Sequence, residues 1–214
     1  MSNIYEIIDE IIEALNELQT EMPDGIIIDL FEKKVLNIKN EKLSYYFAKD
    51  VKGADIKAHG QVIIDSKNLN YNYRFARDVK GADIKAHGQV IIDSKDLEYN
   101  LAYARDVRGT DIKAHGQVII DGKNLEYNYQ FARDVKGADI KAHGQVIIDS
   151  KNLNYNIRFA KDVKGADIKA HQQVIIDSAI AGTDTIECKQ VSSESNCYNK
   201  VKRLMNLLNQ ATDN

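Results

Sequence analysis

Five histidines are the residues of this chain whose type and spacing could do chemistry, because each follows the last by 28 residues. Imidazole is both a common metal ligand and the side chain that titrates near neutral pH, so a metal site and a pH switch are the functional interpretations. Ligands of one metal ion converge to within about 2.1 Å, whereas stacked repeats place equivalent residues about 10 Å apart, which excludes a shared metal. We therefore expect half-buried histidines that are hydrogen-bonded between layers, with a pH response as the open alternative. The set consists of His59, His87, His115, His143 and His171.

No other feature of the sequence indicates catalysis. It contains no nucleotide-binding glycine loop, nucleophile elbow, zinc-protease motif or paired-cysteine motif. The repeated aspartates fall on separate repeats, too far apart for two-carboxylate chemistry. Cys188 and Cys197 make neither a disulfide framework nor a zinc site. The sequence therefore predicts a protein that is not an enzyme and uses no metal or cofactor.

The histidines belong to a longer string that recurs with the same period. AKDVKGADIKAHGQVIIDS begins at Ala48 and returns with few changes every 28 residues. A fixed period of this length is the signature of a repeat architecture. The copies form a central region, 39–178, and span residues 39–66, 67–94, 95–122, 123–150 and 151–178.

Each copy is predicted to form two short helices, because apolar residues such as Phe75 and Ile91 recur at helical spacing in both halves. Asn68 is placed to cap the first helix and Asp83 the second, while Gly81 can take the left-handed conformation that separates them. A strand at VIID would leave the periodicity of the preceding residues unexplained. Helices of about 12 residues are marginal alone, so the copies must stack. We predict an all-α fold, an α-solenoid of tandem two-helix repeats.

The flanking regions are predicted to cap the repeats with helices. Residues 1–38 contain an amphipathic helix over 4–18 and then a degenerate second helix whose apolar residues align with the repeat after a shift of 28 positions. In the C-terminal region, 179–214, the small and polar stretch 178–195 is predicted to be a loop. Residues 198–210 carry apolar side chains on one helical face, which suits a helix that covers the last repeat.

Two further ladders are interpreted as structural. Buried amides need partners, and a neighbouring repeat supplies them, so the asparagines are expected to form a hydrogen-bonded network. A mid-helix glycine costs about 1 kcal/mol of helix propensity, and close packing of adjacent copies is the natural compensation. Gln172 takes the glycine position in the last copy, where no identical copy follows. The ladders are Asn72, Asn100, Asn128 and Asn156, and Gly60, Gly88, Gly116 and Gly144.

The positions that differ between copies share one face of the first helix, because they are spaced i, i+3 and i+4. A continuous surface with aromatic and arginine residues is what a solenoid uses for protein recognition, so we predict that this face binds a partner. The alternative, which the sequence leaves open, is an exposed and unconstrained face. The predicted partner-binding residues are Asn70, Tyr73, Arg74, Glu98, Leu101, Ala102, Glu126, Tyr129, Gln130, Asn154, Ile157 and Arg158.

Charge and hydropathy narrow the class of partner. The formal net charge is −3, so the chain has no overall basic field for nucleic acid. The start is acidic and amphipathic, unlike a signal peptide, and no stretch is apolar enough for a membrane span, so a cytoplasmic protein is expected. The leading hypothesis is a protein-binding scaffold. A structural or self-assembling array that forms a homo-oligomer, and nucleic-acid binding through Lys/Arg ladders, are the alternatives.

The string YYFAKDVKGADIKAHGQVIIDSKNLNYNY resembles short tandem αα-repeats of low-GC Gram-positive bacteria and their bacteriophages. The resemblance covers residues 39–178. It implies the two-helix architecture and a phage or mobile-element setting, in which the scaffold would inhibit or decoy a host protein. It carries no catalytic motif and transfers no activity.

Overall fold

The computed structural model of the chain describes residues 10–14, 17 and 26–184. Across these residues every regular element is a helix, which confirms the all-α fold, and the VIID segments lie inside helices. Most of the expected N-terminal helix, both cysteines and the expected C-terminal capping helix lie outside the described residues.

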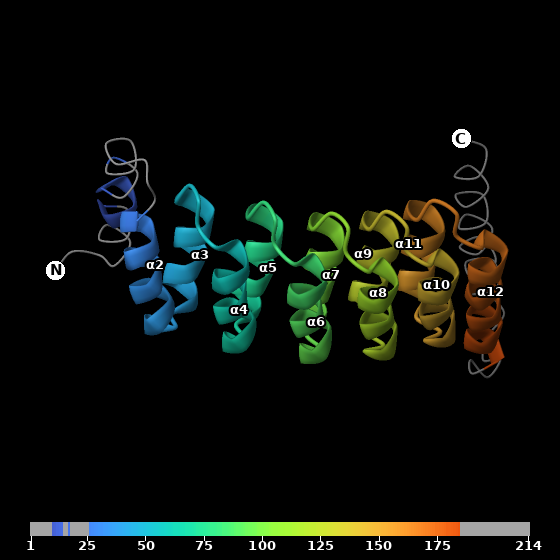
Figure 1. Ribbon diagram of the computed structural model, residues 1–214. Helices are drawn as coiled ribbons and strands as arrows, with labels where there is room; N and C mark the ends of the chain where they lie inside the picture. The colour runs from blue at the N-terminus through green and yellow to red at the C-terminus, as the bar shows by residue number, and fades with distance from the viewer. Residues whose placement is uncertain (1–9, 15–16, 18–25, 185–214) are drawn as a thin grey trace. The chain divides into compact units, whose positions relative to one another are not determined.

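Each repeat consists of a first and a second helix, which follow one another along the chain (Figure 1). From α3 on, odd-numbered helices are the first and even-numbered helices the second helix of each copy, while α2 precedes the first copy. They are α2 (Ile26–Ile38), α3 (Glu41–Asp50), α4 (Ile56–Ser66), α5 (Leu69–Asp78), α6 (Ile84–Ser94), α7 (Leu97–Asp106), α8 (Ile112–Asp121), α9 (Leu125–Asp134), α10 (Ile140–Asp149), α11 (Leu153–Asp162) and α12 (Ile168–Asp184).

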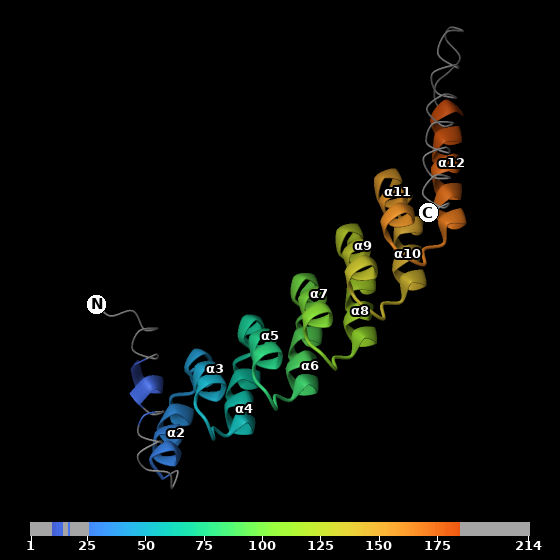
Figure 2. The ribbon, with the colours of Figure 1, turned by 90° about the horizontal axis from the view of Figure 1, so that it is seen from above.

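The chain divides into two compact units within α8, between Val118 and Ile119. In the first unit the first helices α3, α5 and α7 lie side by side in one layer, and α2, α4 and α6 form the layer beside it (Figures 1 and 2). In the second unit α9 contacts α11 and α10 contacts α12 in the same manner. Within each unit, successive helix pairs pack against one another as an α-solenoid of tandem repeats requires.

The helix ends form where the sequence predicts them. The side chain of Asn68 accepts a hydrogen bond from the Tyr71 backbone N–H at the start of α5, and Asp83 accepts one from Ala86 at the start of α6. Gly81 lies between the two helices with a φ of 89°, a conformation that side-chain-bearing residues adopt at a cost. These contacts satisfy backbone groups that each short helix would otherwise leave without partners.

The junctions between copies contain a feature that the sequence did not indicate. A lysine in the left-handed conformation follows the helices α2, α4, α6, α8 and α10, and it precedes the capping residue of the next helix. Glycine is the usual residue there, so sequence reasoning had no signal for it. The lysines are Lys39, Lys67, Lys95, Lys123 and Lys151, with φ between 50° and 57°.

The core lies between the layers, as the periodicity predicted. Phe75 and Ile91 are both completely buried. At the N-terminal end, α2 buries Ile28 and Val35 against Phe47. None of the described helices combines the length and the apolar character needed to cross a bilayer.

The predicted loop at 178–195 is wrong for its first residues, because α12 continues to Asp184. In earlier copies the second helix ends at a left-handed lysine followed by a capping Asn or Asp, as at Lys67 and Asn68. Ala179 and Ile180 stand at those positions in the last copy, so both stop signals are absent. The remainder of the predicted loop lies outside the described residues.

Gly122 offers a test of how these junctions are stabilised. In the copy before it, the Ser94 hydroxyl donates to the Ile91 carbonyl at 2.6 Å and accepts from the Asp96 backbone N–H at 3.1 Å. Gly122 takes the serine position in the third copy and is outside the set of residues with positive φ. We expect Gly122→Ser to raise the free energy of unfolding by about 1 kcal/mol, through these bonds and a less flexible unfolded chain. Urea denaturation measures it, with Gly122→Ala as the control that adds only the Cβ; equal gains would exclude the hydroxyl bonds.

Candidate functional site

The predicted partner-binding face is not uniformly exposed. Of the four residues at the first position of the spacing three are exposed and Glu126 is half-buried, and those at the i+4 position are half-buried. The i+3 column turns inward, since Leu101 is 5% and Tyr129 is 2% exposed. The prediction of one continuous exposed surface is therefore wrong at these two residues. Exposed members are Asn70, Glu98 and Asn154; half-buried ones are Tyr73, Arg74, Ala102, Glu126, Gln130, Ile157 and Arg158.

The tyrosines of this column join one repeat to the next. The Tyr73 hydroxyl donates to the Asp106 carboxylate at 2.8 Å, and Tyr129 donates to Asp162 at the same distance. Arg158 lies 4.3 Å from the centre of the Tyr129 ring. An aromatic side chain at i+3 leans toward the neighbouring first helix, and its contacts hold successive first helices together. That the outer residues of the face bind a partner stays a prediction.

A second set of contacts joins the layers through the histidine and asparagine ladders. Asn72 is completely buried, and its amide nitrogen donates to the carbonyls of Ile63 and Asn68 at 3.0 and 2.9 Å. Its oxygen lies 2.8 Å from Nδ1 of His87 in the following helix. The same bonds join Asn100 to His115. The asparagine network is thus confirmed. The equivalent pairs of the second unit are Asn128 with His143 and Asn156 with His171.

These bonds determine the tautomer of the histidines. Both hydrogens of the Asn72 amide point at carbonyl oxygens, which only accept, so its own oxygen must face His87. Nδ1 of His87 therefore carries the hydrogen, and Nε2 of the neutral ring is an acceptor. Nε2 of His87, His115 and His143 is buried and has no hydrogen-bond partner. The second, third and fourth copies thus each hold a buried acceptor that is left unsatisfied.

The histidines are more buried than predicted, because a ring covers one side and a glycine the other. His87 lies against Phe75, with ring centres 4.8 Å apart. A Cβ added to Gly60 would lie 3.3 Å from the Phe75 ring and 3.4 Å from Nε2 of His87. The half-buried expectation is corrected to complete burial. The close-packing role of the glycines is confirmed at Gly60, and likewise at Gly88 and Gly144.

Burial favours the neutral ring over the imidazolium. It lowers the pKa of His87, His115 and His143 to about 4. The negative charge of the capping aspartate on each histidine's own helix raises the pKa, but by less than burial lowers it. Burial also lowers the pKa of His171. At neutral pH these rings are uncharged, so their Nε2 atoms remain acceptors.

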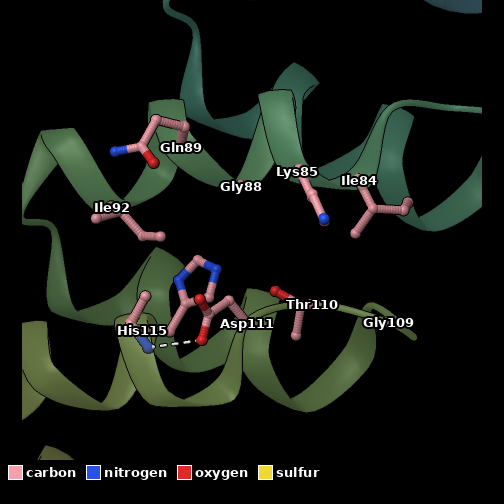
Figure 3. A pocket seen from close by; sticks show the side chains of 10 residues that line it. Ile84, Lys85, Gly88, Gln89, Ile92, Gly109, Thr110, Asp111 and His115 are labelled. Atoms are coloured by element: carbon pink, nitrogen blue, oxygen red, sulfur yellow. Dashed lines mark hydrogen bonds between the residues drawn. The ribbon is translucent and has the colours of Figure 1, made fainter.

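Two grooves open between successive second helices of the first unit, each with a histidine at its base. The groove between α4 and α6 has a volume of about 270 Å³ and that between α6 and α8 about 440 Å³. Figure 3 shows the His115 ring between the two helices beneath Gly88, with Lys85 and Gln89 on one wall and Asp111 on the other. Lys57, Gln61, Asp83 and His87 occupy the same places in the smaller groove. We call these two the open grooves.

The corresponding position between α2 and α4 is occupied by a side chain of the protein itself. Glu32 aligns with the groove glycine Gly60 after a 28-residue shift. One of its carboxylate oxygens accepts from the Asp55 backbone N–H at 2.6 Å and lies 3.2 Å from Nε2 of His59. We call this the filled groove. The sequence did not predict the filled groove. Glu32 lies in the degenerate copy, and at the aligned position the other copies have a glycine such as Gly60, so nothing marked this glutamate as a histidine partner.

The first copy also lacks the asparagine, since Ser44 stands in its place. A carboxylate only accepts, so His59 carries its hydrogen on Nε2 when neutral, the opposite of the other copies. Its Nδ1 and the Ser44 hydroxyl are both buried without partners. Burial lowers the pKa of His59, and the charge of Glu32 opposes that effect.

We expect Ser44→Asn to raise the pKa of His59. The new amide oxygen would face Nδ1 while Glu32 faces Nε2, so both nitrogens would need a hydrogen and the imidazolium would be favoured. NMR titration of the ring measures the pKa. Ser44→Ala is the matched control and should leave it near the wild-type value, because it introduces no acceptor. An unchanged pKa in Ser44→Asn would contradict the tautomer assignment.

The fold places the chain in the class of α-solenoid repeat proteins. Among the described residues no three His, Cys, Asp or Glu side chains are grouped so as to hold a metal ion. No model of a known protein family matches the chain, and no match was found among curated proteins or solved structures. The function is therefore argued from the geometry of the grooves.

Proposed function

We propose that this protein is a non-enzymatic, cytoplasmic scaffold that binds a segment of a partner protein along its second helices. The open grooves carry this proposal, because the same lining occurs twice at a one-repeat interval. Repeats of one groove suit an extended chain, which can present equivalent groups at equal intervals. The binding surface then lies mainly on the second helices, with the outer residues of the first-helix face as a second contact region.

The charges along the second helices support a protein over a nucleic acid. Lys85 and Asp93 are both exposed on α6, and Gln89 donates to Asp93 at 2.7 Å between them. This lysine–glutamine–aspartate order recurs in every copy. Acidic residues at the same interval as the lysines oppose a polyanion.

Affinity capture with the tagged full chain tests the proposal. We expect one stoichiometric protein to remain bound after a salt wash, and Lys57→Glu with Lys85→Glu to weaken its capture. Reversal of both charges alters the groove walls without touching the buried layer. Tyr46 takes the Arg74 position in the first copy, and its ring centre lies 5.9 Å from the Arg74 guanidinium. Tyr46→Ala with Arg74→Ala is therefore the matched variant on the first-helix face. Recovery of nucleic acid that salt removes, or of this protein alone, would contradict the proposal.

The resemblance of the repeats to those of Gram-positive bacteria and phages supports a narrower form of the proposed function. In that form the partner is a host protein that a mobile element inhibits or decoys. Capture from a host lysate distinguishes this from a partner encoded beside the scaffold.

A further inference from the structure

The open grooves present a hydrogen-bond donor beside an acceptor, and the filled groove shows how one side chain reaches both. In the filled groove a single Glu32 oxygen contacts the Asp55 N–H and Nε2 of His59. The equivalent groups between α4 and α6 are the Asp83 N–H and Nε2 of His87. Glycine replaces Glu32 there, and the Nε2 has no partner. A ligand group that enters from the groove can take the place of the Glu32 carboxylate when the groove widens at its base, because Nε2 is buried beneath Gly60 in the unliganded chain.

The hydrogen inventory determines which group complements the open grooves. The bond to Asn72 holds the hydrogen of His87 on Nδ1, so Nε2 offers a lone pair. A carboxylate oxygen would face that lone pair without a hydrogen between them. A carboxamide supplies both missing halves, because its NH₂ donates to Nε2 and its oxygen accepts from the Asp83 N–H. Glutamine has the same shape and length as Glu32 and carries this group.

The spacing determines how such groups are arranged in a partner. Neighbouring second helices are about 10 Å apart. A chain in the polyproline II conformation advances about 3.1 Å per residue and makes one turn every three residues, so every third side chain faces the same way. Three residues thus span one repeat. We propose that the open grooves bind the side-chain carboxamides of a partner segment that takes the polyproline II conformation and has glutamine at every third position. This inference rests on the proposed function and specifies the chemistry of its partner.

The pH dependence of binding separates a carboxamide from a carboxylate. The groups around His87 are Asn72 and Phe75 on α5, Gly60 and Lys57 on α4, and Asp83 on its own helix. Only Lys57 and Asp83 are charged near neutral pH, and they have opposite signs. A carboxylate can bind Nε2 only after the ring takes up a proton, whereas a carboxamide needs none.

A short synthetic peptide with glutamine at every third position and alanine between tests the inference on the full chain. Peptides with glutamate or leucine at the same positions are the controls. At about pH 7 we expect the glutamine peptide to bind at least about tenfold more tightly than either control. It should shift the Nε2 resonances of His87 and His115 and leave that of His59 unchanged, because Glu32 already fills that groove. Equal affinity of the three peptides, or an equal shift at His59, would overturn the inference.

A variant of the chain gives a second test. Gly88→Gln should fill the groove between α6 and α8 with the protein's own carboxamide and abolish the response of His115 but not of His87. Gly88→Ala is its control, since both place a Cβ 3.2 Å from the Tyr103 ring but only glutamine reaches Nε2. If Gly88→Gln does not fold, the titration of the wild-type chain decides. If folded Gly88→Gln and folded Gly60→Gln each capture the partner as well as the wild-type chain does, the scaffold function stands and the carboxamide is excluded. If the wild-type chain captures no partner, the function itself is refuted.

Discussion

Acidification from about pH 7 to about pH 4 is expected to lower the free energy of unfolding steeply, through the buried histidines. Burial lowers the pKa of His87, His115 and His143 from 6.5 to about 4. Above pH 6.5 the rings are neutral in both folded and unfolded chains, so they do not affect the pH dependence. Below it the unfolded chain binds protons first, and stability falls until the folded pKa is reached.

Each of these histidines can contribute up to about 3 kcal/mol to that loss. Urea denaturation at a series of pH values measures it. His115→Gln is the informative variant, because it removes one titrating ring and should make the dependence between pH 6.5 and 4 shallower. The hydrogen bond from Arg105 lowers the pKa of Asp106. Carboxylates of this kind therefore lose their contribution to stability at a lower pH than the histidines do, and this difference in pH range separates the two effects. A midpoint that does not change from pH 7 to pH 4 would show that the rings are not held neutral.

Asn72→Ala is expected to be the most damaging polar substitution, at about 3–5 kcal/mol. The change removes three hydrogen bonds at once, leaves Nδ1 of His87 buried without a partner, and leaves the Ile63 carbonyl with the Ser66 hydroxyl as its remaining donor. Asn70→Ala is the matched control two positions away, where the side chain is exposed, and should cost less than about 0.5 kcal/mol.

Thermal and urea denaturation of the two variants, with circular dichroism to verify helicity, provide the comparison. The tautomer of His87 in Asn72→Ala, read from the Nε2 signal in NMR spectra, gives an independent check. The ring would be free to hold its hydrogen on either nitrogen, so its Nε2 signal should move toward that of His59. Equal stability of Asn72→Ala and Asn70→Ala would contradict the structural role of the ladder.

The helices, caps and core could be predicted from the sequence because they depend on neighbours within one repeat. Asn68 and Asp83 bond to backbone groups three residues away, and Phe75 falls on a stripe that periodicity reveals. The asparagine network was also predictable, since a buried amide requires a partner. The glycine role followed from the cost of a mid-helix glycine.

The orientation of the variable face could not be predicted, because it depends on the angle between successive copies. Tyr129 was assigned to the surface by its spacing, yet it lies beneath Arg158 of the following repeat. The occupied groove was also hidden. Glu32 is one acidic residue among many in the sequence, and only the packing of α2 on α4 brings it to His59.

The glycine on one side of each repeat and the aromatic–histidine pair on the other make the repeat directional. A copy can receive the next only at its glycine side, so reversed or partial insertions have no complementary surface. Duplication or deletion of one whole period, by contrast, regenerates the same junction. Copy number can therefore change in inheritance without a new interface having to evolve, and under the proposed function each added copy would lengthen the bound segment by a constant step.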